Sequence, residues 1–285
     1  MTPIGDGRFN DLRRAAPKSA KSIDLSDTVR CHAKPTPGGP GEKSGKAGIS
    51  EIKLSEGQTA NGQGMTHQEQ QAVYSRRFAG IEQRRAEVWQ ALARHYFPRW
   101  IKPADTVLDL GAGYCEFINS ISAAHKYALD SNPAMAGKAA PGVAVLSQEA
   151  SQPWSMPSES VTVVFSSNFF EHLKSKEDLA HCLAEAYRVL RPQGLLIALG
   201  PNIRFCFDVY WDFVDHHLPL SDRSMVEAME IAGFRTELVI PRFLPFTMSD
   251  RVPHRAFLVR LYLLFPLAQR LWGKQFLVVA RKPGQ

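Results

Sequence analysis

The chain has 285 residues, of which 44% are hydrophobic and 22% are charged, and its formal net charge is +6. This composition excludes a wholly disordered chain. The four cysteines, Cys31, Cys115, Cys182 and Cys206, form no CxxC pair, which argues against a zinc ribbon or a disulfide scaffold and predicts a cytoplasmic location. The longest charge-free apolar run near the C-terminus, 261–269, is far shorter than the ~20 residues of a membrane-spanning helix.

The first 64 residues differ in composition from the rest of the chain. They contain half of the 20 glycines and a single aromatic residue, Phe9. Such a segment cannot bury enough apolar surface to offset its chain entropy, so we predict a disordered tail at 1–64. Met65 follows directly and is an alternative first residue of the protein. The folded domain is predicted at 65–285.

Periodic sequence begins after Met65. Apolar residues at spacings of three and four predict a cap helix within 65–100, over Glu69–Tyr96. Short apolar runs then alternate with helical stretches, which is typical of a parallel, doubly wound α/β sheet. The predicted strands are Thr106–Leu110, Lys126–Leu129, Ala144–Leu146, Val161–Phe165, Leu195–Leu199, Arg235–Ile240 and Gln275–Arg281, and the predicted helices are Glu116–Ala124, Lys176–Leu190 and Ser221–Ala232.

The stretch after the first predicted strand is the most informative part of the sequence. Asp109 is followed by Gly111 and Gly113, and a helix is predicted to begin at once. Glycines at this position let the backbone approach a ligand at the carboxyl ends of the strands. The second predicted strand is followed by Asp130, whose carboxylate can accept the two hydroxyls of a ribose. A dinucleotide-binding fingerprint needs a glycine where this chain has Glu116.

Five features together carry a family resemblance: the glycine loop in 107–117, Asp130, the stretch Gln148–Ala150, the stretch 163–173 after the fourth strand, and Tyr187–Gly194. With them the chain resembles the class I S-adenosylmethionine-dependent methyltransferases of the type 11 group. The resemblance implies a Rossmann-like sheet of seven strands in the order 3-2-1-4-5-7-6, with the last strand antiparallel and helices on both faces. It covers about 101–240.

The resemblance also assigns S-adenosyl-L-methionine as the cofactor. The glycine loop would surround its methionine part, Asp130 its ribose, Ser131 its adenine, Glu149 the adenine amino group, and Asn168 the region of its methyl group. Two positions depart from the family pattern, because Cys115 stands for a third glycine and Thr162 for an aspartate. The residues implied to bind the cofactor are Asp109, Gly111, Ala112, Gly113, Asp130, Ser131, Glu149, Ala150 and Asn168.

The acceptor side of the site is predicted in 201–217, which is dense in aromatic, acidic and histidine residues. His216 and His217 are the candidate general bases, each with packing or capping as the alternative role. Asp208, Asp212 and Asp215 would share one face of a helix and bind Mg²⁺ with His216, but a solvated acidic face explains the spacing equally well, and no metal site is predicted. The candidate substrate contacts are Tyr74, Arg77, Tyr210 and Trp211.

The C-terminal part of the chain is basic, since 241–285 holds eight basic residues and one acidic residue. An insertion at 241–273 contains a nearly all-apolar stretch, 256–272, that Pro266 is expected to kink. This stretch is either a lid over the acceptor, or an interfacial helix on anionic lipid at the inner face of the membrane, or a dimer contact.

These observations favour an enzyme that methylates a small molecule, with a hydroxyl of a sugar, glycolipid or related metabolite as the acceptor. An RNA methyltransferase is the first alternative, supported by the basic ends and disfavoured because no nucleic-acid-binding motif is visible. A partner-binding protein that retains the fold without catalysis is the second. The intact pattern of Asp109, Gly111, Gly113 and Asp130 argues against it.

Overall fold

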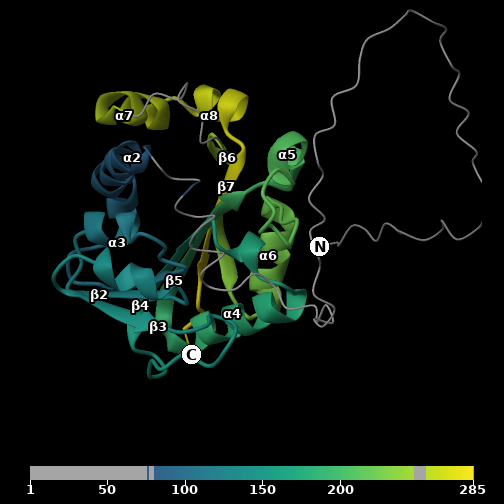
Figure 1. The fold of residues 1–285 in the computed structure, drawn as a ribbon. Helices are drawn as coiled ribbons and strands as arrows, with labels where there is room; N and C mark the ends of the chain where they lie inside the picture. The colour runs from purple at the N-terminus through teal and green to yellow at the C-terminus, as the bar shows by residue number, and fades with distance from the viewer. Residues whose placement is uncertain (1–75, 77–79, 247–254, 285) are drawn as a thin grey trace, which may run out of the picture. The chain divides into compact units, whose positions relative to one another are not determined.

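The computed structural model describes residues 76, 80–246 and 255–284, which form a sheet with helices on both faces (Figure 1). The strands of the sheet are β1 (Thr106–Leu110), β2 (His125–Asp130), β3 (Val143–Ser147), β4 (Val161–Ser167), β5 (Leu190–Pro201), β6 (Arg235–Leu244) and β7 (Gln275–Arg281). Their order is β3-β2-β1-β4-β5-β7-β6. β7 is antiparallel to β5 and β6, and the other pairs are parallel, so the predicted fold class is confirmed.

Helices connect the strands and cover the sheet. They are α2 (Glu82–His95), α3 (Glu116–Ser120), α4 (Lys176–Val189), α5 (Ile203–Tyr210), α6 (Asp222–Ile231), α7 (Ala256–Leu264) and α8 (Pro266–Trp272), with short 3-10 turns η1 (Phe97–Arg99), η2 (Pro133–Gly137) and η3 (Phe170–His172). α2 and α3 lie on one side of the sheet and α4 and α6 on the other (Figure 1).

The two faces of the sheet make two apolar cores because successive side chains of a strand point to opposite faces. In β1, Val107 joins the core under α2 and α3, and Leu108 joins the core under α4 and α6. The ring of Phe117 in α3 stacks on Phe165 in β4 at 3.5 Å between centroids. This packing fixes α3, and with it the loop that precedes α3, against the middle of the sheet.

One predicted helix, and the helical face expected after the fifth strand, are shorter in the structure than the sequence predicts. The helix predicted over Glu116–Ala124 ends at Ser120, because Ile121 is extended. α5 ends at Tyr210, so Asp212 and Asp215 do not continue the helical face that begins at Asp208. The expectation that these three aspartates share one helical face is therefore wrong.

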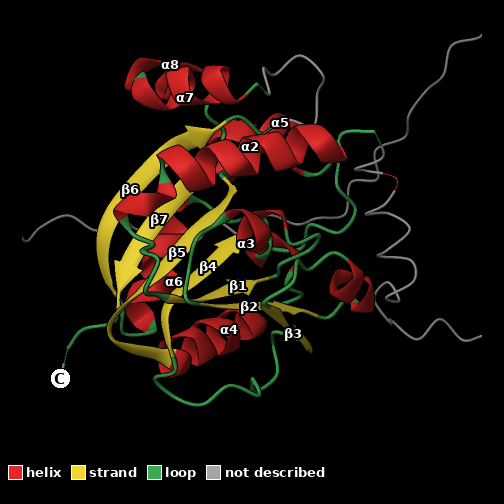
Figure 2. Ribbon diagram, turned by 90° about the vertical axis from the view of Figure 1, so that its left-hand side faces the viewer, coloured by secondary structure: helices red, strands yellow, loops and turns green. Residues whose placement is uncertain are grey.

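The C-terminal insertion forms the two helices α7 and α8, which Figure 2 shows at one end of the molecule beyond α2. The kink expected at Pro266 is confirmed, since Phe265 is extended between the two helices. α7 packs on α2. It is also tied to β6 by the Tyr262 hydroxyl, which donates to the Phe243 carbonyl at 3.0 Å.

The predicted tail at 1–64 and most of the predicted helix before Glu82 lie outside the described residues. Among the described residues, no helix combines the length and the apolar character that a membrane crossing requires.

Candidate active site

The glycine loop lies between the end of β1 and the start of α3, at the carboxyl ends of the parallel strands. Gly111 and Gly113 have φ angles of 69° and 52°, in the left-handed region that favours glycine. A Cβ on Gly111 would lie 2.4 Å from the side chain of Phe169, which follows β4. Glycine at 111 is thus required both by its backbone angle and by the close approach of Phe169.

Asp130 holds this loop from the neighbouring strand. One carboxylate oxygen accepts the N–H of Gly113 at 2.8 Å, and the other accepts the N–H of Asn132 at 2.9 Å. A carboxylate can accept about four hydrogen bonds, so these two leave acceptor capacity. The pair of oxygens beside a glycine loop fits the two vicinal hydroxyls of a ribose.

Asp109 lies in β1, two residues before Gly111, and is buried, with only 3% of its surface exposed. Burial, and then the nearby carboxylates of Asp130 and Glu116, raise the pKa of Asp109 well above its usual range, while the backbone N–H of Ile118 acts in the opposite direction. A cationic group bound at this edge would be attracted by the carboxylate of Asp130 and would favour the ionised form of Asp109. The residues of the loop thus fit a sulfonium cofactor with a ribose, which is the group that the resemblance implies.

The other residues expected at the cofactor lie along the same edge. Ala112 is buried in the loop, Ser131 follows Asp130, and Ala150 is buried after β3. Asn168 follows β4 with a positive φ of 49° and an exposed side chain. The side chain of Glu149 is also exposed. Each of these roles stays a prediction.

Cys115 takes the place of the third glycine of the family pattern. Its φ of 61° is in the left-handed region, where glycine is usual, and its side chain is fully buried against the core under α2 and α3. The thiol thus packs into this core, and Cys115 adopts the left-handed backbone angle at which glycine is usual. Burial raises the pKa of Cys115 to about 12.

A second group of polar side chains lies at the same end of the sheet, after β4 and β5. Ligand atoms of Glu171, His172 and His216 lie within 4.8 Å of one another. Glu171 and His216 are buried, at 2% and 6% exposure. The sequence predicts His216 as a site residue but not Glu171 or His172, because no local pattern shows that 211–217 folds back onto η3.

The two histidines predicted as general bases are placed differently. His216 packs against the rings of Tyr210 and Phe213 at centroid distances of 4.7 and 4.9 Å and faces the Glu171 cluster. His217 is exposed. The structure therefore brings His216, and not His217, to other polar groups of the site.

The predicted substrate contacts are spread out. Tyr210 is fully buried and its hydroxyl donates to the carbonyl of Leu218, so it supports the connection after α5. Trp211 is 52% exposed. Tyr74 and Arg77 lie outside the described residues.

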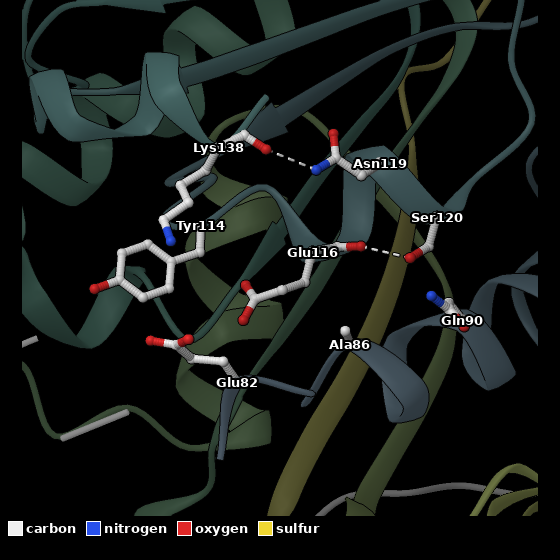
Figure 3. A pocket seen from close by; sticks show the side chains of 8 residues that line it. All are labelled: Glu82, Ala86, Gln90, Tyr114, Glu116, Asn119, Ser120 and Lys138. Carbon is white, nitrogen blue, oxygen red and sulfur yellow. Dashed lines mark hydrogen bonds between the residues drawn. The ribbon is translucent and has the colours of Figure 1, made fainter. Parts of the chain in front are cut away.

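A separate cavity of about 480 Å³ lies between α2 and α3 (Figure 3). Its lining residues are Glu82, Ala86, Gln90, Tyr114, Glu116, Asn119, Ser120 and Lys138. None of them is a residue expected at the cofactor. Arg85 of α2 forms an ion pair with Glu116 at 2.7 Å, so this side of the loop is fastened to α2. The cofactor is expected at the loop edge and not in this cavity, because the carboxylate of Asp130 lies at the glycine loop.

The comparisons with known proteins agree with this geometry. Residues 108–198 match the family model of the methyltransferase domain. No curated protein sequence matches the chain.

Similar solved structures include a S-adenosylmethionine-dependent methyltransferase of Archaeoglobus fulgidus, with 22% identity, a TM-score of 0.53, and coverage of 72% of this chain and 99% of that one. A Thermotoga maritima methyltransferase of the same class has 17% identity, a TM-score of 0.52, and coverage of 74% and 99%. A chain of the Haloferax volcanii complex that contains the Trm112 methyltransferase activator has 18% identity, a TM-score of 0.54, and coverage of 74% and 96%. At these identities the likeness shows the fold alone.

The family match spans the glycine loop, Asp130 and the first five strands, and the seven-stranded order is that of the same class. The chain therefore has a class I S-adenosylmethionine-dependent methyltransferase domain, and its cofactor is S-adenosylmethionine.

Proposed function

We propose that the protein is an enzyme that transfers a methyl group to a hydroxyl of a small molecule, such as a sugar, a glycolipid or a related metabolite. The cofactor supplies an electrophilic methyl group on a sulfonium. The chain's own residues must hold the acceptor near the loop edge and remove the hydroxyl proton.

The observation that carries the proposal is the cluster of Glu171, His172 and His216. It follows β4 and β5, whose carboxyl ends adjoin that of β1, where the glycine loop begins. A hydroxyl is a weak nucleophile that must lose its proton as the new C–O bond forms. Two imidazoles and a carboxylate in a mostly buried place can bind the hydroxyl and take that proton.

Alignment of the acceptor with the methyl group and exclusion of water from His216 are expected to provide the rest of the rate enhancement. Holding two reactants in line avoids much of the entropy cost of their encounter. The aromatic rings of Tyr210 and Phe213 pack around His216, and Phe213 packs on Phe246 at 5.4 Å. This apolar wall restricts water around the imidazole and keeps its orientation fixed.

The test is methyl transfer from labelled S-adenosylmethionine to panels of sugars and glycolipids, followed by mass spectrometry of the product. We expect an O-methyl product, and we expect His216→Asn to lower kcat while the Kd for the cofactor stays within about twofold. Transfer to amines or to RNA alone would contradict the proposal. His181→Asn, an exposed histidine of α4, is the matched control.

We further propose that α7 and α8 rest on an anionic membrane surface. The apolar side chains of the two helices that are 49–67% exposed are Phe257, Leu261, Leu264, Phe265, Leu267, Leu271 and Trp272. Arg255, Arg260 and Arg270 are exposed among them, and 252–285 contains no acidic residue. Apolar side chains next to arginines favour the headgroup region of anionic lipid. An acceptor that is itself lipid-linked would then be within reach of the site.

A further inference from the structure

The cluster of Glu171, His172 and His216 has the composition of a transition-metal site. Imidazole nitrogens suit zinc, copper, iron and nickel, and one carboxylate completes a set of three protein ligands with open positions. Magnesium and calcium prefer oxygen ligands and are disfavoured by two imidazoles. We propose that these three residues bind a divalent transition-metal ion.

The backbone holds two of the three ligands in place. The carbonyl of Glu171 accepts the N–H groups of His217 and Leu218, at 2.8 and 3.1 Å. These bonds join η3 to the segment that carries His216, although the two are more than 40 residues apart in sequence. The cluster is therefore part of the fold and not a chance approach of flexible side chains.

One ring nitrogen of His172 has a hydrogen-bond partner in the protein, as the non-coordinating nitrogen of a metal-binding histidine usually does. Its Nδ1 lies 2.8 Å from the backbone carbonyl of Asp215, with the carboxylate of Asp215 at 3.5 Å. A ligating histidine almost always donates its other ring N–H to such a partner, which fixes the tautomer and the ring plane. With Nδ1 as donor, Nε2 becomes the coordinating atom, and it lies 4.0 Å from Oε1 of Glu171.

The distances require a small contraction on binding. Ligand atoms bonded to one ion at about 2.0–2.2 Å lie roughly 3–3.5 Å apart, whereas the three atoms here lie within 4.8 Å. Rotation of the Glu171 carboxylate toward the two rings would supply most of this contraction. Oε2 of Glu171 lies beside Gly200 of β5, where an added Cβ would stand 3.6 Å from it, so the glycine leaves that space next to the carboxylate open.

Burial and access also suit an ion. Glu171 is 2% exposed, and a divalent cation beside it would offset the cost of keeping its carboxylate charged. The side chain of His172 is 27% exposed, so the ion can enter from that side. The role of the ion rests on the proposed function: at an open position it would bind the acceptor hydroxyl and lower its pKa. With the ion bound, its three ligands no longer take the proton, which would pass to solvent or to the carboxylate of Asp215, 3.5 Å from Nδ1 of His172.

The test uses the purified full chain, stripped of metal with a chelator and titrated with Co²⁺ and then Zn²⁺. We expect one Co²⁺ per chain with a visible absorption band, displacement by Zn²⁺, and no comparable binding of Mg²⁺. Glu171→Gln and His216→Asn should each weaken Co²⁺ binding about 100-fold or more, since loss of a hydrogen-bond partner of a ligand alone typically costs 10–100-fold. His181→Asn should bind as the parent does, and circular dichroism shows whether each variant is folded.

Equal Co²⁺ binding by the parent and folded Glu171→Gln, or no stoichiometric binding by the parent, would overturn the proposal. Methyl transfer is measured separately with and without chelator. A protein that binds Co²⁺ at this site but methylates no hydroxyl compound keeps the metal site and contradicts the proposed function. Full methyl transfer to a hydroxyl compound by a metal-free protein that does not bind Co²⁺ keeps the proposed function and contradicts the metal site.

Discussion

The backbone N–H of Gly113 donates to the carboxylate of Asp130 at 2.8 Å, joining the loop after β1 to the end of β2. The same carboxylate accepts the N–H of Asn132 at 2.9 Å. Asp130 is thus expected to have two roles, since it orders the glycine loop and presents its oxygens to the ribose of the cofactor. Both roles need a carboxylate at this place.

Asp130→Ala should weaken binding of S-adenosylmethionine by about 100-fold or more. Two hydrogen bonds to a charged acceptor, each worth about 1.5–3 kcal/mol, would be lost. Isothermal titration calorimetry measures the Kd, and thermal unfolding shows whether the fold is kept. Asp130→Asn retains the size and one acceptor oxygen, so its Kd should lie between those of the parent and Asp130→Ala. An unchanged Kd in both variants would show that the ribose is held elsewhere.

Asp109→Asn should change how stability depends on pH. Burial raises the pKa of Asp109 in the folded state above its unfolded value, so folding takes up a proton. The stability that this group contributes is complete below the unfolded pKa of about 3.9 and is lost as the pH rises through the folded pKa. The free energy of unfolding of Asp109→Asn, relative to the parent, should therefore increase from pH 4 upward.

Urea denaturation at several pH values between 4 and 8 measures this difference. Asp105→Asn is the control, because Asp105 lies at the opposite end of β1 and its carboxylate accepts from Thr162 at 2.9 Å. A difference between Asp109→Asn and the parent that is independent of pH would contradict the raised pKa.

The strands of the sheet could be predicted from local sequence patterns, and their order was implied by the family resemblance. β1 and β7 have the predicted bounds residue for residue, since each is an apolar run between clear breaks. Asp130 could be assigned to the loop edge because parallel neighbouring strands end at the same edge of the sheet. Here a local pattern and one topological rule were enough.

The acceptor side could not be predicted in the same way. Glu171 and His172 meet His216 only because the backbone N–H groups of His217 and Leu218 bond to Glu171. Such a long-range contact has no periodic signal. The expected acidic face of Asp208, Asp212 and Asp215 depended on a continuous helix, and α5 ends at Tyr210.

The three described cysteines should be unreactive in the folded protein. Burial raises the pKa of Cys115, Cys182 and Cys206 to about 12, so at pH 8 only about one thiol in ten thousand is ionised. In a Cys31→Ser background, Ellman's reagent should label no thiol of the native protein within an hour and three thiols in denaturant. Rapid labelling of one native thiol, mapped by mass spectrometry, would show that its site opens to solvent.

Asn202→Ala should destabilise the fold by about 2–4 kcal/mol. The buried Asn202 amide donates to Asp222 at 2.7 Å and to the Pro241 carbonyl at 2.9 Å, and its side-chain oxygen caps α5. The substitution removes a helix cap and two hydrogen bonds donated by the buried amide, one of which the buried Asp222 accepts, and these losses together give this range. Asn132→Ala, which removes a single capping bond to Ala134 outside the core, should cost only about 1 kcal/mol. Equal urea midpoints for the two variants would contradict the larger contribution to stability expected of the Asn202 hydrogen bonds.

The surface of α7 and α8 is tested by substituting Leu264, Leu267 and Leu271 with serine, since these side chains are 59–67% exposed and contribute little to the core. We expect the parent to co-sediment with vesicles that contain phosphatidylglycerol and to bind pure phosphatidylcholine vesicles at least ~10-fold more weakly, because each arginine near an anionic surface is worth about 1 kcal/mol. The triple variant should lose most of this binding, because burial of a leucine side chain contributes about 1.5–3 kcal/mol. Ile231→Ser, at an 81% exposed isoleucine of α6, is the matched control and should bind as the parent does. The parent could instead fail to bind anionic vesicles and sediment as a dimer, while the triple variant sediments as a monomer. The exposed apolar surface of α7 and α8 would then be a contact between two copies of this chain, and the membrane proposal would be wrong.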